Sequence, residues 1–150
     1  MNPFRSLPEY EHFVYTLQQR HPCVLHATLT VARRSRGLAI VAGELHFAHG
    51  YRLVVAEIIT WDQGPLVIQH YGYEVWCGSE KRYWYDPQPH PDQPELASTY
   101  PHHKHVPPDT LIPEVKRSGI KHHRIPAPGL RFDAPNLQLL IEEVEQQLQI

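Results

Sequence analysis

Three consecutive stretches of this chain decide its fold: LAIVAGELHF at 38–47, YRLVVAEIITW at 51–61 and LVIQHYGYEVW at 66–76. In each of them the apolar residues tend to alternate, and β-branched and aromatic side chains dominate, which is the pattern of β-strands. Two further stretches of the same kind, 24–32 and 82–85, bring the expected number of strands to about five. We therefore expect a sheet over residues 23–86.

The connections between these stretches are short and polar, for example 48–50, 62–65 and 78–80. Parallel neighbours would need crossovers of a dozen or more residues, whereas antiparallel neighbours can be joined by a few. The sequence therefore predicts an antiparallel β-meander.

Helical patterns flank the strand-rich region on both sides. Phe13, Val14 and Leu17 have helical spacing, which predicts a helix over 8–20. A second helix is expected over 135–149, where one apolar stripe consists of Leu137, Leu140, Ile141, Val144 and Leu148. We expect both helices to pack on one face of the sheet in an α+β fold, which leaves the other face for a site or a partner.

Length and charge narrow the class of protein. The 150 residues suit a single domain spanning 1–150. No run of about 18 apolar residues and no secretion signal is present, so we expect a cytoplasmic protein without a membrane span.

A net charge of −2 argues against nucleic-acid binding over the whole surface, so that any such binding must be local. Cys23 and Cys77 show no metal-binding spacing and are expected to be reduced.

The composition changes abruptly over 86–131, which holds ten of the fifteen prolines. We expect little regular structure there and interpret the segment as a long functional loop rich in proline and histidine. A low-complexity linker is the alternative.

The densest group of reactive side chains is the motif PHHKH at 101–105. In an extended conformation His103 and His105 share one side, and His102 and Lys104 share the other. Two imidazoles can act on one RNA substrate, one as general base for a ribose 2′-OH and one as general acid for the leaving 5′-oxygen. The motif therefore predicts a ribonuclease that requires neither a metal nor another cofactor.

Positive charge near the motif would stabilise the phosphate in the transition state. Lys104 can do so together with an arginine such as Arg82 or Arg124. Residues 101–131 carry six basic side chains against two acidic ones, and they include Lys121, so we expect a local RNA-binding patch.

Two other interpretations of the histidines stay open. Neutral imidazoles also bind transition metals, which would make the protein a metal-binding protein or a metal-dependent hydrolase. The charge of Lys104 inside the motif argues against a nearby cation. The third interpretation is a solvated loop in a non-catalytic interaction module.

Two more positions add candidate site residues. In YWYD at 83–86, Tyr83 and Tyr85 share one face and could stack on bases, although such residues are more often part of a core. Asp86 could orient a histidine tautomer, or it could belong to a turn before Pro87. Glu57 interrupts an apolar strand side, so it is either a site residue or faces solvent.

At residues 83–86, at His90 and above all at 101–105, the chain resembles the TumE-like family of bacterial toxin-antitoxin toxins. The resemblance extends over residues 38–105 and is most specific at the PHHKH motif. It implies a small cytosolic toxin that is partnered by a helix-turn-helix antitoxin, with a homodimer also open.

Overall fold

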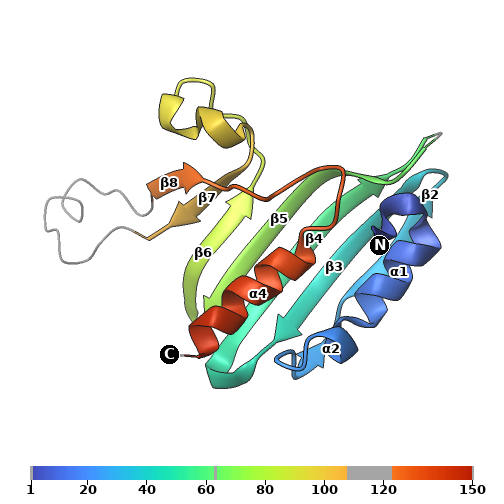
Figure 1. The fold of residues 1–150 in the computed structure, drawn as a ribbon, viewed down its shortest axis with the longest axis horizontal. Coiled ribbons are helices and arrows are strands. Elements are labelled where there is room, and N and C mark those ends of the chain that lie inside the picture. The colour runs from blue at the N-terminus through green and yellow to red at the C-terminus, as the bar shows by residue number, and fades with distance from the viewer. Residues whose placement is uncertain (1, 63, 108–122, 150) are drawn as a thin grey trace, which may run out of the picture.

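The structure is a computed structural model that describes residues 2–62, 64–107 and 123–149. These residues form an α+β fold built on an antiparallel sheet (Figure 1). The eight described strands are β1 (His26–Ala27), β2 (Thr30–Ser35), β3 (Leu38–His46), β4 (Tyr51–Thr60), β5 (Val67–Cys77), β6 (Glu80–Asp86), β7 (His103–Val106) and β8 (His123–Pro126). The described helices are α1 (Leu7–Tyr15), α2 (Leu17–Arg20) and α4 (Leu137–Leu148), with short 3-10 helices η1 (Pro3–Arg5), η2 (Ala48–Gly50) and η3 (Pro94–Thr99).

The sheet is a meander in which β3 to β8 pair in chain order, and both β1 and β2 pair with β3. The single strand expected over 24–32 is therefore interrupted. Gly43 explains the interruption, because the backbone of Thr28 and Leu29 passes so close that a Cβ at Gly43 would lie 2.5 Å from the Thr28 carbonyl oxygen. Gly43 also has a φ of 140°, which side chains rarely adopt.

The antiparallel α+β architecture is confirmed, but the expectation of about five strands is too low. The prediction of little regular structure over 86–131 is wrong where β7 and β8 form. Prolines flank β7 at Pro101 and Pro107, and Pro126 ends β8, the last strand of the sheet. Proline is tolerated at strand ends and edges, so a proline-rich composition conceals two strands of four residues each.

Both terminal helices are present and cover one face of the sheet (Figure 1). The helix expected over 8–20 is divided at Thr16, whose hydroxyl donates to the carbonyl of His12 at 2.7 Å and so competes with the helical backbone. The helix expected over 135–149 begins and ends slightly inside that range.

The core lies between this face and the helices, and Glu57 is buried within it with 1% exposure. Its carboxylate accepts hydrogen bonds of 2.5 Å from Tyr10 on α1 and from Tyr73 on β5. Asn136, at the start of α4, donates to the Tyr73 hydroxyl at 3.2 Å. A buried polar group without a partner would cost about 1 to 3 kcal/mol, so these contacts tie both helices to the sheet. Glu57 therefore holds the core together and does not face solvent.

None of the described helices combines the length and the apolar character that a membrane crossing requires.

Substitution of Glu57 by Gln should change how stability depends on pH. Burial raises the pKa of Glu57 above its ordinary value of 4.5, although the hydrogen bonds from Tyr10 and Tyr73 act to lower it. The folded state then binds a proton that the unfolded state has lost, so the stabilisation is complete below 4.5 and is lost as pH rises through the folded pKa.

We expect the difference in unfolding free energy between wild type and Glu57→Gln to fall as pH rises above 4.5. Urea unfolding of both proteins across a pH series measures it. Parallel stability curves for the two proteins would contradict the expectation.

Candidate functional site

The pairing of β7 with β6 assembles the candidate site. In this register His103 lies opposite Asp86, and His105 lies opposite Trp84. Side chains alternate along each strand, and directly paired residues of antiparallel strands share a face. All four side chains therefore gather on the face of the sheet that the helices leave uncovered.

Asp86, His103 and His105 form a compact cluster, which we call the Asp–His–His cluster. The His103 Nε2 atom lies 3.1 Å from Asp86 Oδ1, and the His105 Nε2 atom lies 3.0 Å from Asp86 Oδ2. The two Nε2 atoms are 2.9 Å apart. Both imidazoles are buried, at 1% and 5% exposure, whereas the Asp86 side chain is 27% exposed. The cluster is thus reached from solvent on the side of the carboxylate.

Neighbouring groups fix the orientation of both imidazoles. His103 Nδ1 lies 3.0 Å from the carbonyl oxygen of Pro101, which can only accept, so Nδ1 carries the proton of the neutral ring and Nε2 carries the lone pair. His90 contacts the His103 ring edge to face, with the ring centroids 4.7 Å apart. Trp84 stacks parallel to the His105 ring at 4.9 Å.

Trp84 is a site residue that sequence reasoning did not select. The signal was present in the alternation of β6, which places Trp84 on the same face as Asp86.

The cluster combines a charged carboxylate with a neutral imidazole. Burial acts to raise the pKa of Asp86, but the hydrogen bonds from His105 and the Gln88 N–H and the charges of His103 and His105 outweigh it and bring the pKa to about 2. Burial lowers the pKa of His103, and the charges of His105 and His90 lower it further, which together outweigh the opposing effects of the Pro101 carbonyl and Asp86. At neutral pH Asp86 is therefore ionised and His103 is neutral.

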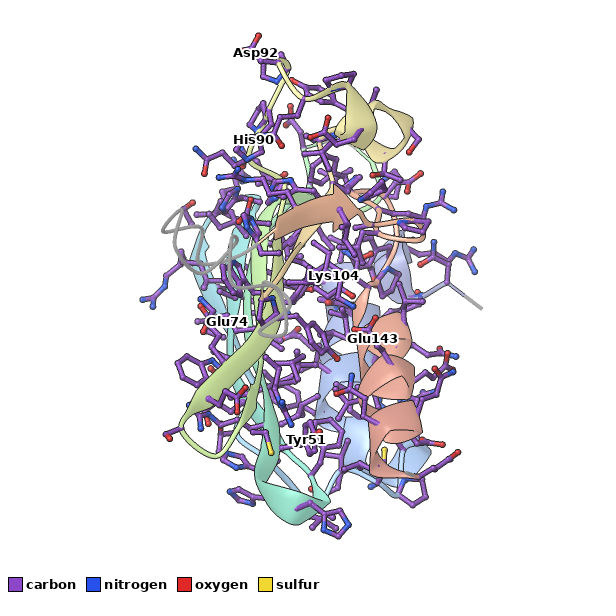
Figure 2. All side chains as sticks on the ribbon, turned by 90° about the vertical axis from the view of Figure 1, so that its left-hand side faces the viewer. Tyr51, Glu74, His90, Asp92, Lys104 and Glu143 are labelled. Carbon is purple, nitrogen blue, oxygen red and sulfur yellow. The ribbon has the colours of Figure 1, made fainter. Side chains whose placement is uncertain are left out.

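Lys104 lies on the opposite face of β7, where it faces α4 (Figure 2). Its Nζ atom pairs with Glu143 at 3.2 Å and sits 4.1 Å from the centre of the Tyr83 ring. Tyr85 donates to Glu143 at 2.8 Å, and both tyrosines are buried, at 7% and 6% exposure. Lys104 therefore does not join the Asp–His–His cluster, and neither tyrosine presents an exposed ring on which a base could stack.

Two further predicted site residues, His102 and Arg82, also lie outside the Asp–His–His cluster. His102 shares a hydrogen bond of 2.7 Å with Tyr71 and lies on the helix side of the sheet. Arg82 pairs with Glu80 at the beginning of β6, away from Asp86 at its end.

Arg124 and Lys121 were the other predicted RNA contacts. Arg124 lies opposite His105 in β8, and within the described part of the chain its buried Nε atom has no hydrogen-bond partner. Lys121 lies outside the described residues. Of the predicted nucleic-acid contacts in the described ranges, Arg124 is therefore the one that the register brings beside the cluster.

Two imidazole nitrogens and one carboxylate oxygen also form a ligand set for a metal ion. One such atom from each residue of the cluster lies within 4.8 Å of the others. Both proton transfer and metal binding are therefore chemically available to these three residues.

Comparison with known proteins gives one family. A family model described as "Toxin TumE" matches residues 13–148, which include the whole sheet and helix α4. Neither the comparison with curated proteins nor that with solved structures gave a match.

The tautomer of His103 tests this description of the cluster. We expect the proton of the neutral ring on Nδ1, held by the Pro101 carbonyl, and a titration below the ordinary pKa of 6.5 because the ring is buried. Long-range ¹H–¹⁵N correlation spectra recorded across a pH series measure both properties. A proton on Nε2 of the neutral ring would contradict the contact with the Pro101 carbonyl, and a midpoint at or above 6.5 would show that burial does not dominate the pKa of His103.

Proposed function

This chain belongs to the TumE toxin family, and from that premise we propose that it is the toxin of a toxin-antitoxin pair and that it cleaves RNA at the Asp–His–His cluster. The observation that carries the proposal is the convergence of three buried or half-buried polar side chains, with 2.9 to 3.1 Å between their nitrogen and oxygen atoms. Buried polar clusters with perturbed pKa values are typical of catalytic centres.

RNA suits such a centre because its ribose supplies the nucleophile. The 2′-oxygen attacks the phosphorus, the bond to the 5′-oxygen breaks, and a 2′,3′-cyclic phosphate forms. One proton must leave the 2′-OH and one must reach the 5′-oxygen, while negative charge on the phosphate is stabilised. The imidazoles and the carboxylate of the cluster are groups that can transfer protons, and the Arg124 guanidinium is a group that can stabilise negative charge on the phosphate.

The spacing of the cluster bears on how the protons move. In an in-line displacement the attacking and leaving oxygens lie on opposite sides of phosphorus, so a separate base and acid need to reach opposite sides of the phosphate. The Nε2 atoms of His103 and His105 are 2.9 Å apart. This geometry favours one centre that acts as a unit over the two independent histidines expected from the sequence.

Arg124 is the phosphate contact that we propose beside this centre. It lies across from His105, and a guanidinium can bind two phosphate oxygens at once. Lys121 stays a prediction from the sequence.

The proposed setting of the toxin follows from its family. An antitoxin is the expected partner. We propose that this antitoxin is a helix-turn-helix protein and that the toxin is located in the cytoplasm. A homodimer of the toxin stays a prediction.

Removal of the cluster should abolish toxicity and RNA cleavage together. We expect Asp86→Asn and the double substitution His103→Gln, His105→Gln to reduce cleavage of total RNA by at least about 100-fold, the lower range for loss of a proton-transfer group. Growth after induction should recover in parallel. His70→Gln is the matched control, because His70 is an exposed histidine on β5 outside the cluster.

Inhibition of growth that the double variant retains at the wild-type level would reject the proposal. It would support instead a non-catalytic interaction module.

A further inference from the structure

The contacts at hydrogen-bond distance within the Asp–His–His cluster outnumber the hydrogen atoms that could form these hydrogen bonds. His103 Nδ1 donates its proton to Pro101, so the neutral ring has none on Nε2. The Asp86 carboxylate only accepts. With both rings neutral, one hydrogen at most, on His105 Nε2, is available for the three contacts of 2.9 to 3.1 Å. Protonation of His103 would add a second hydrogen and still leave one of the three contacts without any. With a neutral His103 ring the His103–Asp86 contact places two lone pairs face to face, which is unfavourable unless a proton or a metal ion lies between them.

A metal ion satisfies all three contacts at once. Bonds of about 2.0 to 2.1 Å from a first-row metal to nitrogen or oxygen place neighbouring ligands about 2.8 to 3.0 Å apart in an octahedron and about 3.3 to 3.4 Å apart in a tetrahedron. The observed separations of 2.9 to 3.1 Å match neighbouring positions of an octahedron. Two imidazoles with one carboxylate favour transition metals, whereas magnesium and calcium prefer oxygen ligands.

We propose that Asp86, His103 and His105 bind one divalent first-row transition metal ion through the carboxylate and the two Nε2 atoms. Three ligands on one face leave further positions for water or phosphate oxygens, on the side where Asp86 is 27% exposed. The use of this ion in RNA cleavage rests on the proposed function, whereas its binding does not.

The surroundings of the cluster are those of a metal site. Metal-bound histidines commonly donate the other ring N–H to a backbone carbonyl, as His103 does to Pro101. The Asp86 carboxylate is itself held by the backbone N–H of Gln88 at 3.0 Å. Lys104, whose charge argued against a cation in the sequence, is directed to the other face and neutralised by Glu143 at 3.2 Å.

Titration of the metal-free full-length chain with Zn²⁺ tests the proposal, measured by calorimetry. We expect one tight site in the wild type and a Kd at least about 10-fold higher in Asp86→Asn, His103→Gln and His105→Gln, since even outer-sphere substitutions cost this much in metal sites. His70→Gln should bind like the wild type and thereby controls for the twelve histidines of the chain. Circular dichroism establishes that each variant is folded.

A readout on the wild type alone removes the dependence on variants. One equivalent of Zn²⁺ should shift the ¹⁵N signals of Nε2 in His103 and His105 and leave those of His70 in place. Equal Zn²⁺ affinity in wild type and all folded cluster variants, or unshifted Nε2 signals, would overturn the proposal.

RNA cleavage with and without EDTA separates this proposal from the proposed function. Cleavage that needs the cluster but survives EDTA, with no Zn²⁺ bound, would reject the metal and keep the ribonuclease. Zn²⁺ binding at the cluster without RNA cleavage would keep the metal site and reject the ribonuclease.

Discussion

The site depends on one constraint, the register in which β7 pairs with β6. With His103 opposite Asp86 and His105 opposite Trp84, one carboxylate and two imidazoles come to lie on the uncovered face of the sheet. A shift by one residue would exchange the two faces of β7 and bring Lys104 into the place of the histidines. The geometry of the cluster therefore depends on strand pairing and not on the sequence of the motif alone.

The opposite face explains why this register is stable. Lys104 lies against the rings of Tyr83 and Tyr85 and is paired with Glu143 of α4, and Tyr85 donates a hydrogen bond to the same carboxylate. Alternate residues of one short strand thus have two tasks: Lys104 anchors the strand to the helix, and His103 and His105 form the cluster. Deeper in the core, Glu57 and its two tyrosines hold the helices over the sheet in which β7 lies between β6 and β8.

Sequence reasoning succeeded where the pattern is local. Alternation predicted the central strands, and the extended motif placed His103 and His105 on one side, where the structure brings Asp86 within 3.0 to 3.1 Å of both rings. It failed where pairing is distant or composition misleads, because prolines concealed β7 and β8. The roles of Tyr83 and Tyr85 depended on which face the helices cover, and no residue of the YWYD segment reveals that face.

Asp86, His103 and His105 converge on one point, where we propose that they hold a metal ion. The most direct measurement is a crystal structure of the protein grown with Zn²⁺, with anomalous diffraction recorded at the zinc edge. We expect an anomalous peak about 2.0 to 2.2 Å from both Nε2 atoms and from an Asp86 oxygen. Imidazoles that point apart, or a zinc peak bound only by other histidines, would contradict it.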